Sequence, residues 1–220
     1  MKILVIIPAY NEAEKIGEVI KEIKASVFDV LVVDDGSSDS TAEVSRVGGA
    51  QVLSHRLNRG QGAALKTGID FAKIKNYELV VFFDADGQMK ANEIAKVILP
   101  VTSGRSEVAL GSRFLGQVKN ISIAKLITLK LGLIFTRITT GLKLTDTHNG
   151  FQAWKLSALN KINLTQDRQA YASELIQEIA EQKLNYQEVP VTITYTNYSK
   201  SKGQSIFNAF NIIFNLLIKR

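Results

Sequence analysis

Two aspartates, a glycine and a glutamine follow a short apolar run in the stretch ELVVFFDADGQ, residues 78–88. Carboxylate and amide oxygens this close together form an oxygen-only ligand set of the kind that suits Mg²⁺ or Mn²⁺. Asp84, Asp86 and Gln88 are therefore candidate ligands of a divalent metal ion. The same residue types also make an ordinary turn, because Asp and Gly are common where a strand ends.

The elements around this stretch decide between the two interpretations. Leu79–Phe83 is apolar at every position, as expected for a strand buried on both faces of a parallel sheet. Polar residues follow three further expected strands, as PAYNE at 8–12, DDGS at 34–37 and GSR at 111–113. Ligands of open α/β sheets bind outside the carboxyl ends of the strands, so four such ends favour a ligand site over isolated turns.

Strands and helices are expected to alternate through the first half of the chain. The expected strands are Lys2–Ile7, Val30–Val33, Gln51–Ser54, Leu79–Phe83 and Glu107–Leu110. The expected helices are Glu12–Lys24, a segment ending near Val47 after N-cap residues at 37–41, Gly62–Lys73 and Asn92–Val101. This alternation predicts an α/β fold, a Rossmann-like doubly wound and mostly parallel sheet with helices on both faces.

Composition limits the class of protein and the kind of partner. The 220 residues include no cysteine, which excludes disulfides, thiolate metal sites and a cysteine nucleophile. The N-terminal apolar run is too short, and its proline too early, for a signal peptide. Residues 1–110 carry 13 Lys/Arg against 15 Asp/Glu, whereas residues 111–220 carry 14 against 6. The basic second half indicates an anionic partner: phosphate groups, membrane headgroups or nucleic acid.

Two rival folds explain the motifs less well. A dinucleotide-binding fold needs a Gly-rich fingerprint after the first strand, where this chain has PAYNEAE. Gly60-Gln61-Gly62 is the only GxG, and Leu65 stands where the third glycine belongs. A receiver-like module gathers aspartates at strand ends but leaves the DxD-plus-Gln spacing and the basic second half unexplained.

With PAYNE, VVDDGSSDST, FFDADGQ and GSR in this order, the chain resembles the family 2 glycosyltransferases of the GT-A fold over about residues 2–203. Among them it looks most like the polyprenyl-phosphate sugar transferases, the dolichyl-phosphate-mannose synthase group. The resemblance implies a GT-A domain over 1–202, with a nucleotide-sugar half at 1–110 and an acceptor half at 111–202. It implies Mg²⁺- or Mn²⁺-dependent, inverting transfer of a hexose-type sugar from a nucleotide diphosphate sugar to a polyprenyl phosphate. The expected place is the cytoplasmic face of the cell membrane, as a peripheral protein active in cell-wall biogenesis.

The resemblance also assigns roles to residues. The nucleotide-sugar site would comprise Pro8, Ala9, Tyr10, Glu12, Val33, Asp35, Asp84, Ala85 and Asp86. Asp84, Asp86 and Gln88 match the family's metal site, and Arg113 and Lys202 its phosphate-binding positions. Asp84, Asp86, Arg113 and Asp146 are the expected catalytic set. His148 receives no role.

Several of these assignments have simpler alternatives. Tyr10 would also suit a surface loop, and the charge of Glu12 would favour the first turn of a helix. Arg113 has an exposed strand-end arginine as its alternative, and Asp146 is either an acceptor-side or a structural residue. The dolichyl-phosphate-mannose enzymes have an arginine where this chain has Thr196, which favours a UDP-sugar over GDP-mannose.

Two apolar segments bear on the membrane. Ile121–Leu142 is interrupted by Lys125, Lys130 and Arg137, and predicts a basic amphipathic helix that lies in a bilayer surface. Residues 203–218 lack charge, but at ~1.5 Å per residue they reach only ~24 Å, short of a ~30 Å hydrocarbon core. Residues 203–220 therefore predict an amphipathic helix at the membrane interface, or one that packs on protein.

The acceptor and the class of function keep alternatives open. A saccharide hydroxyl would need a base, for which Asp146 would be the leading candidate, whereas a lipid phosphate would not. A non-catalytic nucleotide-binding or receiver-like module is the alternative of another class. No nucleic-acid partner is expected, and a homo-oligomer or a membrane-protein partner is compatible with the sequence.

Overall fold

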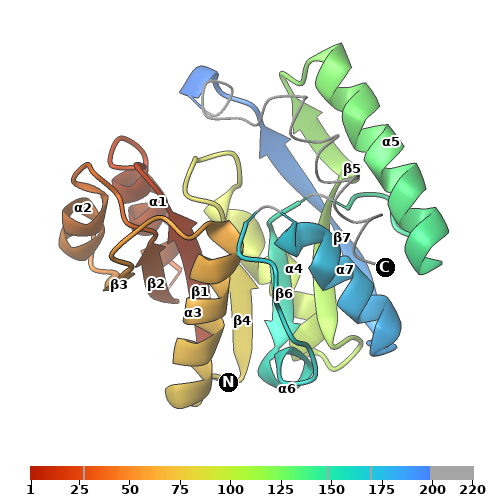
Figure 1. The fold of residues 1–220 in the computed structure, drawn as a ribbon, viewed down its shortest axis with the longest axis horizontal. Coiled ribbons are helices and arrows are strands. Elements are labelled where there is room, and N and C mark those ends of the chain that lie inside the picture. The colour runs from red at the N-terminus through yellow and green to blue at the C-terminus, as the bar shows by residue number, and fades with distance from the viewer. Residues whose placement is uncertain (27, 148, 169, 199–220) are drawn as a thin grey trace.

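The computed structural model describes residues 1–26, 28–147, 149–168 and 170–198, which form one seven-stranded sheet covered by helices (Figure 1). The strands are β1 (Ile3–Ala9), β2 (Asp29–Asp34), β3 (Gln51–Ser54), β4 (Leu79–Phe82), β5 (Val108–Lys119), β6 (Gln152–Lys155) and β7 (Tyr186–Thr194). The helices are α1 (Ile16–Lys24), α2 (Thr41–Val47), α3 (Gln61–Ile74), the short 3₁₀ helix η1 (Ala91–Glu93), α4 (Ile94–Thr102), α5 (Ile123–Thr140), α6 (Leu156–Leu159) and α7 (Tyr171–Glu181).

The strand order is β3-β2-β1-β4-β6-β5-β7, and all strands except β6 run in the same direction. β1 pairs in parallel with β2 and β4, and β5 pairs in parallel with β7. β6 lies between β4 and β5 and is antiparallel to both. The predicted mostly parallel sheet is confirmed, and the carboxyl ends of six strands share one edge.

Alternate residues of each central strand face opposite layers of helices. Val5 and Ile7 of β1 belong to a core formed with α1 and α4, whereas Leu4 and Ile6 belong to a core formed with α3, α6 and α7. Both faces of the sheet are therefore buried, which explains why the strands are apolar at successive positions. Helices on both faces confirm the doubly wound arrangement.

β5 differs from the expectation that it ends at Leu110. It continues to Lys119, and its pairing with β7 shifts in register between Ser112 and Gln117. Gly116 lies so close to the backbone of Val191 that a side chain would collide with it. The predicted loop at GSR is therefore wrong: Gly111–Arg113 lies inside a strand, where an irregular segment of the β-bulge type begins.

Other differences concern element ends and elements that the sequence did not reveal. α1 begins at Ile16 rather than Glu12, because residues 12–15 form turns in which the Glu12 carbonyl accepts from Ile16. β6 and α7 were not foreseen; β6 is four residues long, and its central Trp154 is fully buried.

α5 corresponds to the amphipathic helix predicted at Ile121–Leu142. Ser122 caps its first turn by accepting from the Lys125 amide at 3.3 Å, and Gly141, with φ of +72°, ends it. No helix in the described part of the chain combines the length and the hydropathy needed to cross a membrane. The helix predicted at 203–220 lies outside the described residues.

Candidate active site

Segments far apart in the sequence meet at the carboxyl edge of the sheet. β6 is antiparallel to β4 and pairs Phe82 with Gln152, so residues that follow β4 lie beside residues that precede β6. β5 pairs Leu110 with the same Gln152, and the Gly111 amide donates to the Phe151 carbonyl at 2.8 Å. The segments DADGQ (84–88) and GSR (111–113) are therefore brought together with residues 145–147 and 149–151.

Asp84 is half-buried two residues beyond β4 and lies against the backbone of Gly150. A Cβ atom on Gly150 would be 2.7 Å from each carboxylate oxygen of Asp84, which is closer than side chains tolerate. Gln61, the first residue of α3, donates its side-chain amide to Asp84 Oδ1 at 3.1 Å. The carboxylate is thus confined between the segment before β6 and the start of α3.

Asp86 is held by Gln88 in a tight turn. The Gln88 backbone amide donates to Asp86 Oδ1 at 3.0 Å, and its side-chain amide donates to Oδ2 at 2.7 Å. Gly87 takes a φ of +73°, which glycine adopts without strain. The side-chain nitrogen of Gln88 therefore orients Asp86, and the prediction that its oxygen binds a metal stays a prediction.

The two aspartates form an electrostatically strained pair. Burial, followed by the negative charge of Asp86, raises the pKa of Asp84 to about 7, while the charge of Arg113 acts in the opposite direction. Burial is also the main cause that raises the pKa of Asp86. A divalent cation fits such a pair because it would compensate both carboxylates. Within the described ranges, no group of three or more His, Cys, Asp or Glu side chains could hold a metal, so other donors would complete the coordination.

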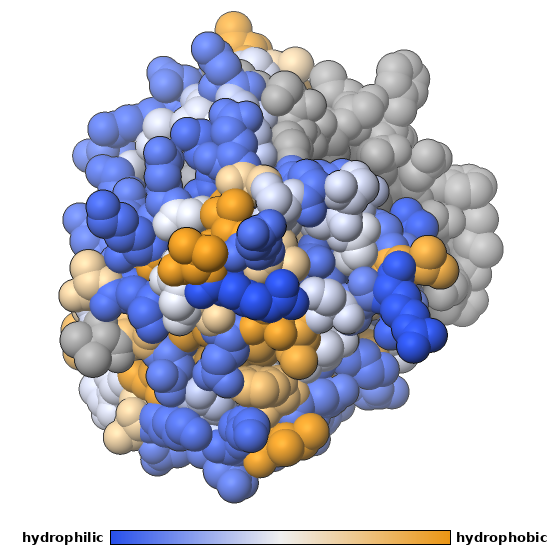
Figure 2. Space-filling model, turned by 90° about the vertical axis from the view of Figure 1, so that its left-hand side faces the viewer, coloured by the Kyte–Doolittle hydropathy of each residue, from blue (hydrophilic) through white to orange (hydrophobic). Residues whose placement is uncertain are grey.

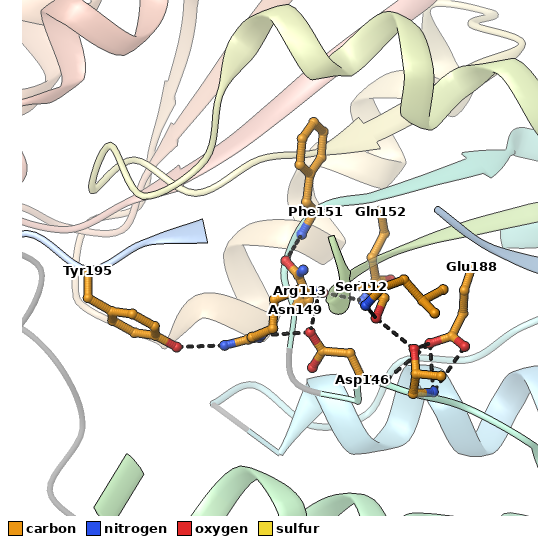
Figure 3. Close-up of polar contacts among 10 residues, drawn as sticks. Ser112, Arg113, Asp146, Asn149, Phe151, Gln152, Glu188 and Tyr195 are labelled. Atoms are coloured by element: carbon orange, nitrogen blue, oxygen red, sulfur yellow. Dashed lines mark hydrogen bonds and ion pairs between the residues drawn. The ribbon is translucent and has the colours of Figure 1, made fainter. Parts of the chain in front are cut away.

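Arg113 is buried in an ion pair with Asp146 (Figure 3). Its Nε donates to Asp146 Oδ2 at 2.6 Å, its backbone amide donates to the same oxygen at 3.0 Å, and its Nη1 donates to the Tyr195 hydroxyl at 2.6 Å. Burial alone would lower the pKa of Arg113, but Asp146 and Tyr195 outweigh it and raise the pKa. The alternative of an exposed strand-end arginine is wrong, since only 4% of Arg113 is exposed.

The residues expected to bind the nucleotide lie at the ends of β1 and β2, in the loops that follow them, and after β4. Of these, Tyr10 is 45% exposed, whereas Pro8, Ala9, Val33 and Ala85 are buried. Tyr10 is therefore the side chain of this group that a base can reach directly. The roles of the others stay predictions, with Pro8 and Val33 facing each other in the β1–β2 ladder.

Asp35 has several partners within the protein. It accepts from the backbone amides of Arg59 at 3.0 Å and Gly60 at 2.6 Å, and it lies 2.7 Å from His55 Nδ1. These bonds hold the loop between β3 and α3, which leads to Gln61. The predicted nucleotide contact of Asp35 is not tested by them, but they give this carboxylate a structural task.

Glu12 is buried and meets a residue from the far end of the described chain. The Tyr198 hydroxyl donates to Glu12 Oε2 at 2.7 Å, and burial together with the Glu12 charge raises the pKa of Tyr198. Tyr195, three residues earlier, contacts Arg113. The segment 195–198 therefore joins the loop after β1 to the arginine in β5.

Comparison with known proteins decides the family. The family model described as glycosyl transferase family 2 matches residues 4–162. The chain is 33% identical to a UDP-N-acetylglucosamine–dolichyl-phosphate N-acetylglucosaminyltransferase of Methanococcus voltae, over 98% of this chain and 95% of that protein. It is 30% identical to a polyprenol monophosphomannose synthase of Mycolicibacterium smegmatis, over 94% of this chain and 83% of that protein.

The chain belongs to glycosyl transferase family 2. Its fold matches that of glucosyl-3-phosphoglycerate synthase from Mycobacterium tuberculosis, solved with Mn²⁺ and UDP-glucose, with a TM-score of 0.74 and 18% identity over 98% of this chain and 76% of that chain. The predicted GT-A fold and the prediction of an enzyme are confirmed. A receiver-like or non-catalytic module is thereby excluded.

Two predicted features of this glycosyltransferase lie outside the described residues. Lys202, the second expected phosphate-binding residue, falls in 199–220, as does the expected interfacial helix. His148, which received no role, is also outside them.

Sequence reasoning missed several residues of the candidate site. Gln61 is the middle residue of the GxG that does not fit a dinucleotide fingerprint, and no sequence signal indicates its contact with Asp84. Gly150 and Tyr195 lie outside the motifs on which the sequence-based expectations depend. Gln61 and Gly150 contact Asp84, and Tyr195 contacts Arg113. These partners are far apart in the sequence, so no local pattern predicts the contacts.

Proposed function

We propose that this enzyme transfers a hexose-type sugar from a nucleotide diphosphate sugar, with a UDP-sugar favoured, to a polyprenyl phosphate at a membrane surface. The observation that carries the proposal is the meeting of a strained carboxylate pair, Asp84 and Asp86, with the buried cation Arg113 at one edge of the sheet. Residues 1–110 would form the nucleotide-sugar half and residues 111–202 the acceptor half.

The carboxylate pair would hold Mg²⁺ or Mn²⁺, with Gln88 either as a ligand or as the residue that orients Asp86. A bound cation would supply positive charge against the donor diphosphate and the charge that develops on the leaving nucleotide. Gln61 and Gly150 would keep Asp84 in place for this role. Support comes from the carboxylate chemistry and from the Mn²⁺ in the synthase of similar fold.

Arg113 would bind phosphate oxygens, because a guanidinium suits a pair of oxygens. Its Nε is committed to Asp146 and its Nη1 to Tyr195, which fixes the plane of the guanidinium. The nucleotide-sugar donor would be held by Tyr10 at its base and by Glu12 at its ribose. The relatives' names support a sugar donor and a lipid phosphate acceptor, because one names a UDP-sugar with a dolichyl phosphate and the other a mannose with a polyprenol phosphate.

A lipid phosphate acceptor is already an anion, so its attack on the anomeric carbon needs little or no proton removal. Catalysis would then depend on positioning and electrostatic stabilisation. A saccharide hydroxyl would need a base, and Asp146 is unsuited to that task because its Oδ2 is buried in the pair with Arg113. This pairing favours the lipid phosphate over a saccharide hydroxyl.

The exposed face of α5 supports contact with a membrane. Apolar residues recur along it every three or four positions and are 53–78% exposed: Ile123, Ile127, Leu131, Ile134 and Ile138. No acidic residue occurs from Val108 to Thr145, whereas this range contains six basic residues. The side of the molecule away from α5 differs from this helix. Figure 2 shows that side, at α2, where hydrophilic residues predominate and apolar residues form small separate groups. An apolar stripe beside basic residues fits an anionic bilayer surface, and we assign α5 to it.

The start of α5 lies near the candidate site. Burial, and then the positive charge of Arg113, lowers the pKa of Lys125 in the first turn of α5. A lipid held along α5 would therefore bring its phosphate toward two cations. The cytoplasmic face as the location, and the interfacial role of 203–220, stay predictions.

A donor and acceptor screen tests the proposal. The purified chain would be incubated with Mn²⁺, radiolabelled UDP-sugars or GDP-mannose, and either undecaprenyl phosphate or a free saccharide. We expect label to enter the organic phase with undecaprenyl phosphate, and with a UDP-sugar in preference to GDP-mannose. Transfer to free saccharides alone would contradict the proposed acceptor.

Membrane contact has its own test, in which binding to vesicles with and without anionic lipid is measured by co-sedimentation. Leu131→Glu is expected to weaken binding to anionic vesicles. Val47→Glu is the matched control, since Val47 is an exposed apolar residue, 86% exposed, on α2. Equal binding by both variants would contradict the assignment of α5 to the bilayer.

A further inference from the structure

Glu188 of β7 holds the turn that carries Asp146 (Figure 3). Its Oε1 accepts from the Thr145 amide at 2.8 Å, from the Thr145 hydroxyl at 2.8 Å and from the Asp146 amide at 3.1 Å. Its Oε2 lies 2.9 Å from the Thr145 amide nitrogen. One half-buried carboxylate thus satisfies three donors of two consecutive residues, and neither residue lies in a helix or strand.

A second set of hydrogen bonds extends from this turn to β5. The hydroxyls of Thr145 and Ser112 are 2.6 Å apart, and the Leu115 amide donates to the Ser112 hydroxyl at 3.2 Å. Because the Thr145 hydroxyl donates to Glu188, the proton between the two hydroxyls must come from Ser112. The donors therefore run in one direction, from Leu115 through Ser112 and Thr145 to Glu188.

This direction matters because Ser112 and Leu115 flank Arg113 in the irregular part of β5. The register with β7 shifts between Ser112 and Gln117, and irregularities of this kind change the direction in which a side chain points. The Ser112–Leu115 bond closes the segment that contains Arg113. Glu188 thus stabilises both partners of the ion pair: Asp146 through its backbone amide, and Arg113 through the hydroxyl chain.

We propose that Glu188 is a positioning residue that fixes the Arg113 guanidinium for phosphate binding. This inference rests on the proposed function, because phosphate binding by Arg113 is part of it. A carboxylate suits the task because it only accepts hydrogen bonds, and every group that faces Glu188 in this network is a donor. Glutamine in its place would turn an N–H₂ group toward one of those donors.

Glu107 offers a matched control before the first residues of the same two strands, whereas Glu188 pairs with Leu110 farther along them. It immediately precedes β5 and accepts from the Asn185 amide, just before β7, at 3.1 Å and from Lys161 Nζ at 2.8 Å. Its loss should affect stability without reaching the carboxyl edge of the sheet. An effect shared by Glu188 and Glu107 variants would therefore be a general effect on the fold.

The experiment compares Glu188→Ala, Glu188→Gln and Glu107→Ala in two measurements. The first follows the ¹⁵N–¹H NMR signal of Arg113 Nε, assigned by its loss in Arg113→Lys. The second is the kcat/KM of sugar transfer, including an Arg113→Lys/Glu188→Ala double-mutant cycle. A shift of the guanidinium by about 1 Å can cost roughly 10²-fold in rate, and a residue that acts through Arg113 should lose most of its effect in the Arg113→Lys background.

We expect the Arg113 Nε signal to shift or broaden in Glu188→Ala and to be unchanged in Glu107→Ala. We expect kcat/KM to fall by roughly 10–10²-fold in Glu188→Ala, by less in Glu188→Gln, and by less than about threefold on adding Glu188→Ala to Arg113→Lys. If Glu188→Ala does not fold, Glu188→Gln decides by the same two measurements.

An unchanged Arg113 signal, additive losses in the cycle, or equal losses in Glu188 and Glu107 variants would overturn the inference. The NMR measurement needs no turnover, so it keeps the positioning role separate from the proposed reaction. A wild-type chain that transfers no sugar, but whose Arg113 signal responds to Glu188, would contradict the reaction and leave the positioning intact.

Discussion

Replacement of Gly150 by alanine should move the Asp84 carboxylate while leaving the fold intact. The added Cβ would lie 2.7 Å from both Oδ1 and Oδ2 of Asp84 and 3.0 Å from its Cγ. Gly150 is not among the residues with positive φ, so alanine can adopt its backbone conformation. The collision therefore falls on one side chain, and that side chain is half of the proposed metal site.

The size of the effect follows from these distances. Ordinary contacts of a Cβ atom begin near 3.4 Å, so the carboxylate must move by about 0.7 Å. Such a shift would stretch or break its 3.1 Å hydrogen bond from Gln61. Misplacement by 1 Å can cost roughly 10²-fold in rate, so we expect kcat/KM for transfer to fall by about 10–10²-fold. Overpacking of this kind costs about 1–3 kcal/mol of unfolding free energy, which a stable domain survives.

The assay combines steady-state transfer kinetics, Mn²⁺ titration and urea denaturation. Gly48→Ala is the control: its Cβ, next to α2, would approach the Ile20 side chain at 3.2 Å and the Val44 carbonyl oxygen at 3.4 Å. We expect Gly150→Ala to weaken Mn²⁺ binding and transfer, and Gly48→Ala to leave both unchanged. Wild-type kinetics and Mn²⁺ affinity in folded Gly150→Ala would refute the role given to Asp84.

Three further substitutions test other contacts of the site. Asp146→Ala leaves Arg113 buried without its carboxylate, so the free energy of unfolding should fall by about 3–5 kcal/mol in urea denaturation, and wild-type stability would contradict the importance of the pair. Tyr198→Phe removes the hydroxyl that donates to Glu12 Oε2, so that oxygen can bind the ribose and the KM for the nucleotide sugar should fall. A raised KM would indicate instead that the Tyr198 hydroxyl helps to bind the nucleotide sugar. Gln61→Ala removes the amide donor to the first carboxylate of the pair; the Kd for Mn²⁺ should rise about 10-fold or more in a titration, and an unchanged Kd would exclude this supporting role.

The sequence predicted the parts of the site that depend on local order. Leu79–Phe83 is uniformly apolar and ends in two aspartates, so the strand and the position of Asp84 beyond its end could be read directly. The alternation of elements through residue 110 likewise predicted a parallel sheet with ligands at its carboxyl edge.

The contacts that assemble the site could not be read in this way. Arg113 and Asp146 are 33 positions apart, and they meet because β6 enters the sheet antiparallel between β4 and β5. β6 has only four residues, so it leaves little periodicity to detect. In β5, the Gly and Ser of GSR are residue types common in turns. They lie in a strand because β5 pairs with β7, and a tertiary contact of this kind is not encoded in the local sequence.

The proposed metal-dependent sugar transfer is tested most directly by comparing the wild-type chain with Asp86→Ala in transfer from a radiolabelled UDP-sugar to undecaprenyl phosphate, with Mn²⁺ and with excess chelator. We predict lipid-linked product from the wild-type chain with Mn²⁺, none with chelator, and none from Asp86→Ala, whose circular dichroism and thermal unfolding should match the wild type. Full activity of Asp86→Ala, or of the wild-type chain under chelation, would contradict the account.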